Sequence, residues 1–134
     1  MKKNIWIGIL VVMSISTFSF SIKQSDKEVA FPKDYRNWTL VKSEVILEGH
    51  ENYNLFGGFH HVYANKIAIN SLKNGKTYMD GSVLVFDLME EKVVNRKITE
   101  GKRKVTGVMV KDRFQFTETG GWGCEDFKQV DPKQ

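Results

Sequence analysis

Cysteine is almost absent from this chain of 134 residues. Cys124 is the only one, so no internal disulfide can form and a disulfide-stabilised scaffold is excluded. A single thiol in an exported protein is either buried and inert or paired with another molecule. The neighbouring Trp122 and Phe127 favour the buried state, which is the state we expect.

The common catalytic and metal-binding motifs are absent as well. The three histidines show no HxH or HExxH spacing. On a strand, the adjacent His60 and His61 face opposite sides, so they do not share one metal ion, and we expect ordinary hydrogen-bonded histidines near a sheet edge. No GxSxG turn exists, and residues 120–123 lack the Lys and Ser or Thr of a phosphate-binding loop. The residues alone therefore indicate neither a catalytic residue nor a protein-built metal site.

Clustered positive charge is also scarce. The formal net charge is +4, and it falls to +2 when the two lysines of residues 1–21 are removed. One basic cluster exists, but Thr99, Glu100 and Gly101 interrupt it, and a solvated loop explains it; its members are Arg96, Lys97, Lys102, Arg103 and Lys104. A nucleic-acid partner is therefore not expected.

The amino terminus has the pattern of a secretory signal peptide over residues 1–21. Lys2 and Lys3 precede an apolar stretch over 5–20, which ends in small residues suited to cleavage before Ile22. An uncleaved membrane anchor is the alternative, because the stretch is only slightly shorter than the ~20 residues of a membrane span. No cysteine lies near the cleavage site, so a lipoprotein anchor has no residue to which it could be attached. The sequence predicts a periplasmic protein without a stable membrane span after cleavage.

The remaining chain predicts a polar leader over residues 22–30 and one domain over 31–134. Pro32 starts a short helical turn whose aromatic residues clamp the amino end onto the core. Strands are expected at 39–47, 82–88 and 105–110, and Gly120-Gly121 breaks the chain before a last strand that opens on Trp122. We read residues 90–104 as a strand end, a loop and the lead into the strand at 105–110. The predicted fold class is α+β, an antiparallel sheet of about four or five strands flanked by short helices.

Two segments carry clear periodicity. Residues 82–88 (SVLVFDL) direct Val83 and Val85 to one side and Leu84, Phe86 and Leu88 to the other, so both faces are apolar and the strand is predicted to be central.

The second periodic segment, residues 64–72, is predicted to be a helix. It places Ile67, Ala68 and Leu72 on one face, and Asn74-Gly75 closes it.

Five short motifs, taken in order, resemble the cytochrome P460 family. They are residues 31–38 (FPKDYRNW), 61–65 (HVYAN) with Ala68, 80–83 (DGSV), 108–112 (VMVKD) and 119–123 (TGGWG). The resemblance implies an exported c-type haem protein with an antiparallel sheet, a small-molecule ligand and often a homodimer. Some members oxidise hydroxylamine, whereas the cytochrome c-prime-beta branch binds nitric oxide or carbon monoxide in an apolar pocket.

The sequence departs from that family pattern at the haem attachment. The resemblance implies haem c held by a C-x-x-C-H motif, which this chain does not contain. Two interpretations remain open: the chain is truncated before that segment, or it is a haemless binding or structural module.

It also departs at two pocket positions. Phe86 stands where hydroxylamine-oxidising members carry a cross-linking Lys, and Gly107 where a proton-relay carboxylate is expected. The resemblance therefore favours nitric oxide binding over hydroxylamine oxidation, with Phe86, His60 and Met109 as candidate haem-pocket residues.

Overall fold

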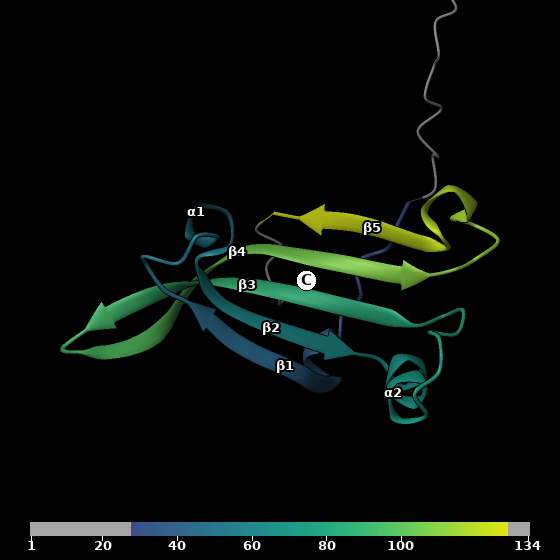
Figure 1. Cartoon of the computed structure of the whole chain (residues 1–134), viewed down its shortest axis with the longest axis horizontal. Helices are drawn as coiled ribbons and strands as arrows, with labels where there is room; N and C mark the ends of the chain where they lie inside the picture. The colour runs from purple at the N-terminus through teal and green to yellow at the C-terminus, as the bar shows by residue number, and fades with distance from the viewer. Residues whose placement is uncertain (1–27, 129–134) are drawn as a thin grey trace, which may run out of the picture.

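The structure, a computed structural model, describes residues 28–128 and consists of one antiparallel sheet with short helices around it (Figure 1). Each strand pairs with the next in sequence, so the sheet is a five-stranded meander in the order β1-β2-β3-β4-β5. The strands are β1 (Thr39–Ile46), β2 (Gly58–Ala64), β3 (Val83–Val94), β4 (Lys97–Lys111) and β5 (Trp122–Phe127). The helices are η1 (Tyr35–Asn37), α1 (Tyr53–Phe56), α2 (Lys66–Lys73) and η2 (Thr117–Thr119). The predicted α+β class with an antiparallel sheet is confirmed.

The predicted signal peptide, most of the leader and residues 129–134 lie outside the described residues. Among the helices of the described part, none has the length and apolar character that crossing a membrane requires.

The sheet has two distinct faces because side chains alternate along each strand. One side carries Tyr63, Val85 and Val108, which are neighbours in the strand register. We call it the core face. The other carries Val62 and Phe86, and we call it the pocket face. The predicted alternation in residues 82–88 and the central position of that strand are confirmed.

The amino-terminal segment covers the core face. Val29 and Tyr35 are buried there against Val85 and Val108. Phe31 meets Tyr35 edge to face, with ring centroids 5.8 Å apart, and meets Phe127 in the same way at 5.1 Å. Such aromatic pairs contribute roughly 0.5–1.5 kcal/mol beyond the area they bury. The predicted aromatic clamp at the start of the domain is confirmed.

The strand end predicted in residues 90–104 is confirmed, but the predicted loop is wrong. β3 continues to Val94 and β4 begins at Lys97, so the segment is a long hairpin arm that extends beyond the other strands (Figure 1). Asn95 and Arg96 have φ values of 50° and 63°, as a two-residue type I′ turn requires. The β-branched Val93 and Val94 suit a strand even though they are exposed, and the basic cluster therefore lies largely on β4.

The predicted helix at 64–72 is present as α2. The Asn65 side chain caps it by accepting a hydrogen bond from the Ala68 amide at 2.9 Å. The predicted packing face was partly wrong, because Ile67 and Leu72 are exposed while Ala68 and Ser71 are buried. Small side chains at i and i+3 let the helix backbone approach the sheet closely, which the larger residues would prevent.

Candidate functional site

A largely apolar hollow lies on the pocket face. Its volume is about 380 Å³, and it spans β2, β3, β4 and β5. It is lined by Val62, Leu84, Phe86, Gly107, Val108, Met109, Cys124 and Asp126. A cavity with apolar walls and one carboxylate is the usual form of a small-ligand site.

The three candidate pocket residues lie on this one face. Phe86 and Met109 both line the hollow. His60 lies beside Phe86, with ring centroids 5.0 Å apart in an edge arrangement, but it is not part of the lining. It is 5% exposed, and its Nε2 donates a hydrogen bond to the carbonyl of Phe56. His60 therefore braces the Phe86 ring from the side.

Asp126 contributes a carboxylate that the sequence analysis did not single out. It pairs with Gly107 in the register of β4 and β5. A Cβ atom at Gly107 would lie 3.2 Å from Asp126 Oδ1, so the glycine leaves room for this carboxylate over the strand. The alternation that begins at Trp122 puts Cys124 and Asp126 on the same face, and that pattern could have revealed the residue.

Cys124 is exposed, which corrects the prediction of a buried thiol. It lies opposite Met109 in the register and lines the same hollow. The reason is its place in the sheet: β5 is an edge strand, and the buried core lies on the other face. The aromatic neighbours in sequence pack elsewhere: Phe127 packs on the core face, and the Trp122 ring packs against Tyr78.

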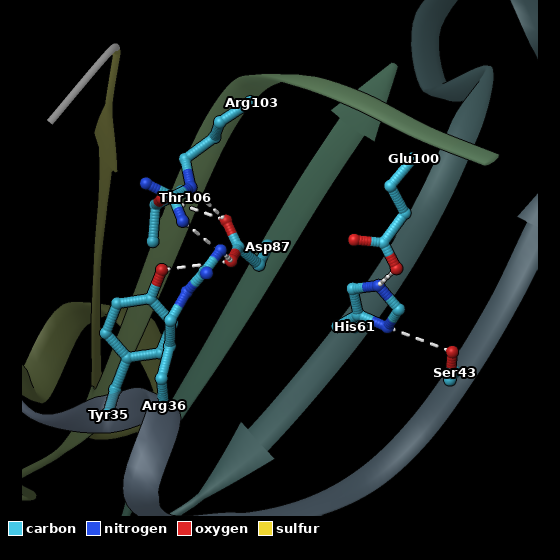
Figure 2. A network of polar contacts seen from close by, with 8 residues as sticks. All are labelled: Tyr35, Arg36, Ser43, His61, Asp87, Glu100, Arg103 and Thr106. Atoms are coloured by element: carbon cyan, nitrogen blue, oxygen red, sulfur yellow. Dashed lines mark hydrogen bonds and ion pairs between the residues drawn. The ribbon is translucent and has the colours of Figure 1, made fainter. Parts of the chain in front are cut away.

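Asp87, the residue after Phe86, is the centre of a buried polar network on the core face (Figure 2). Its side chain is 0% exposed. It accepts a bond from Arg103 Nε at 2.6 Å, and Tyr35 Oη and Arg36 Nη2 each donate to Oδ2 at 3.0 Å. Thr106 Oγ1 donates to Oδ1 at 3.2 Å. The network joins η1 to β3 and β4, directly behind the strand that carries Phe86.

The carboxylate of Asp87 makes the fold sensitive to acid. Burial raises its pKa, but hydrogen bonds from Arg103 and Arg36 outweigh burial and hold the pKa below the ordinary value of 3.8. A pKa lowered by folding means that the stabilisation is complete above the unfolded-state value and is lost as pH falls through the folded-state value. We therefore expect urea unfolding to show a loss of stability below about pH 4. An Asp87→Asn variant should lose less stability over that range.

His61 ties three strands together beside this network (Figure 2). Its Nε2 lies 2.7 Å from Glu100 Oε1 on β4, and its Nδ1 lies 2.9 Å from Ser43 Oγ on β1. When Nε2–H donates to the carboxylate, Nδ1 accepts from the hydroxyl, so both ring nitrogens are satisfied. His60 and His61 therefore face opposite sides, as predicted.

The described residues contain no cluster of three or more His, Cys, Asp or Glu side chains that could hold a metal ion. This part of the chain provides an apolar wall with one carboxylate on the pocket face. The ion pairs of Asp87 stabilise the sheet on the opposite, core face. A comparison with curated proteins gave no match. The profile of the Cytochrome P460 family matches residues 32–134, and the chain therefore belongs to the cytochrome P460 family of haem-binding proteins.

Proposed function

We propose that the pocket face is the wall beside a haem and that the protein binds nitric oxide or a similar small uncharged ligand. The observation that carries this is the apolar hollow itself, in which Phe86 and Met109 stand side by side with Val62 and Leu84. Apolar walls around a haem favour uncharged diatomic ligands over charged substrates. Membership of the cytochrome P460 family, a haem-binding family, supports the binding of haem by this chain.

The residues of the hollow fit one face of a porphyrin. Val62, Phe86 and Met109 would contact the macrocycle and exclude water from it. When bound, the haem supplies an iron atom that takes the small ligand. No histidine belongs to the lining, and His60 Nε2 already donates to a carbonyl, so the residues of this face would hold the macrocycle by apolar contact rather than supply an imidazole to its iron.

Hydroxylamine oxidation is less well supported by these side chains. Phe86 offers no amine for the cross-link that the resemblance associates with that activity, and Gly107 offers no carboxylate. Asp126 does bring a carboxylate over Gly107, so proton transfer alone does not separate the two activities. The two activities are separated by position 86, where Phe86 has no amine to form the cross-link.

Export to the periplasm is part of the same proposal. It rests on the basic start and the apolar stretch over residues 5–20.

Titration of haemin into the purified full chain tests the proposal. This chain has no C-x-x-C-H motif, so the assay measures haem held without covalent attachment. We expect a saturable Soret band at one haem per chain, and a shifted band when nitric oxide is added to the reduced complex. Absence of saturable binding would favour a haemless module. Spectra of thioether or thiolate ligation that disappear in Met109→Leu or Cys124→Ser would instead show that the wall itself ligates iron, against the proposal.

A further inference from the structure

The hairpin arm ends in a segment that extends away from the rest of the sheet. β2 pairs with β3 only as far as Met89, and β5 pairs with β4 only from Thr106. Beyond these positions, and within residues 28–128, β3 and β4 pair only with each other (Figure 1). Every residue over 92–98 is exposed, and we call this segment the arm tip.

The arm tip carries aliphatic side chains on both of its faces. Val93 pairs with Ile98 in the register of the hairpin, and Val94 pairs with Lys97. Because paired residues share a face and successive residues alternate, Val93 and Ile98 lie on one face and Val94 lies on the other. Val93 is 65% exposed, Ile98 is 38% exposed and Val94 is 58% exposed. A partner that surrounds the arm tip would therefore bury more apolar surface than a partner that covers one face.

The arm tip is also positively charged. Lys92, Arg96 and Lys97 are its charged residues, and it contains no acid. None of these three cations forms an ion pair with another residue of the described chain. The charge of the arm tip is therefore available to an anionic partner.

The acidic residues of the arm lie nearer to the sheet and have partners of their own. Glu91 accepts a hydrogen bond from Tyr53 Oη, and Glu100 Oε1 lies 2.7 Å from His61 Nε2. Glu90 accepts a hydrogen bond from a backbone amide at 3.3 Å. These contacts hold the negative charge at the base of the arm, away from the cations of the arm tip.

We propose that the arm tip inserts into the headgroup region of an anionic lipid bilayer. The cations bind at the level of the lipid phosphates, and the aliphatic side chains reach the boundary with the acyl chains. The three residues of β3 in the arm tip span about 10 Å at ~3.3 Å per residue, which matches the ~5–10 Å depth of interfacial binding. The pocket face and haem take no part in this contact.

A bilayer suits the arm tip better than an acidic protein surface does. A folded protein would cover one face of the hairpin and leave either Val94 or the Val93–Ile98 pair in water, whereas lipid headgroups surround an inserted hairpin. The outer backbone groups of the arm have no neighbouring strand within residues 28–128, and they keep their hydrogen bonds in the hydrated headgroup region. The hydrocarbon core would remove those hydrogen bonds, so the contact is attachment at the surface.

A fluorescent probe in the arm tip tests the proposal on the full chain. Val94→Cys in a Cys124→Ser background leaves one thiol for the environment-sensitive dye nitrobenzoxadiazole. We expect a blue shift and at least about a threefold rise in emission with vesicles of equal parts phosphatidylglycerol and phosphatidylcholine. With vesicles of phosphatidylcholine alone, the rise should be less than about 1.3-fold even where the chain sediments with them, because the arm tip then meets no anionic surface.

Charge reversal tests the electrostatic contribution. Lys97→Glu changes the arm tip by two charge units, each worth about fivefold in binding to an anionic surface. At a lipid concentration below saturation, the rise in emission should therefore fall at least about fivefold. Lys66→Glu makes the same charge change on α2 and should alter the rise by less than about twofold. Circular dichroism checks that each variant is folded.

A probe at Leu72→Cys in the same background is the matched control for position. Leu72 is 46% exposed on α2, which lies at the opposite end of the sheet from the arm (Figure 1). Its emission should be unchanged by either vesicle. A Val94 probe that stays in water on anionic vesicles, equal responses of the two probes, or no effect of Lys97→Glu would each overturn the proposal. So would an equal rise with soluble polyglutamate, which would assign the arm tip to an acidic protein, or a rise with protein concentration alone, which would assign it to a second copy.

Discussion

Asp87→Asn is expected to lower the free energy of unfolding by about 3 kcal/mol at neutral pH. The substitution keeps the shape of the side chain but removes the charge that two arginines face. The loss of this charge affects Arg103 more than Arg36, because the side chain of Arg103 is 9% exposed whereas that of Arg36 is 46% exposed. Urea unfolding followed by tryptophan fluorescence measures the difference.

Asp80→Asn is the matched control for that substitution. Asp80 also pairs with an arginine, Arg113, at 3.0 Å, but the side chains are 34% and 70% exposed. Exposed ion pairs are worth about 0–1 kcal/mol, so the control should lose no more than that. Equal losses in the two variants would contradict the idea that burial of the Asp87 network holds η1, β3 and β4 together.

The class of the fold and the two faces of β3 could be predicted because they depend on local periodicity. Val83 and Val85 alternate with Leu84 and Phe86, and alternation in a short β-branched run has few other structural solutions. The helix α2 was likewise predicted from the spacing of Ile67, Ala68 and Leu72 and from Asn74-Gly75 at its end. Which side of α2 would be buried depended on how closely the sheet approaches, and the periodic pattern does not contain that distance.

The hairpin arm and the Asp87 network could not be predicted for different reasons. The turn at Asn95-Arg96 has none of the glycine that usually marks a type I′ turn, so the segment resembled a charged loop. Tyr35 and Asp87 are separated by 52 positions, and an aspartate within an apolar strand gives no sign of its partners. Long-range polar contacts of this kind depend on the register of the whole sheet.

Two of the three candidate pocket residues line one hollow, and the reason is physical. Phe86 and Met109 come together because β3 and β4 pair with Phe86 opposite Gly107. Asp126 reaches the same hollow only because β5 adds to β4 in one register, in which the glycine leaves space for a carboxylate. A shift of one residue would turn Asp126 to the core face. The wall is therefore a property of strand pairing rather than of any single motif.

Phe86→Glu is expected to weaken haemin binding to the full chain at least about 30-fold, or about 2 kcal/mol. The new carboxylate would stand in the middle of the apolar wall, beside Asp126, and contact with the macrocycle would remove water from both anions. Phe86→Leu keeps the wall apolar, so its affinity should stay within about threefold of wild type. Soret titration of the three proteins gives the dissociation constants.

The control for charge alone is Val93→Glu on the hairpin arm. Val93 is 65% exposed and lies outside the hollow, so the same new carboxylate there should change haemin affinity by less than about twofold. If Phe86→Glu bound haemin as tightly as Val93→Glu, with both variants folded by circular dichroism, haem would not rest on the pocket face. The family's haem would then require a different surface of this chain, and the apolar hollow would need another occupant.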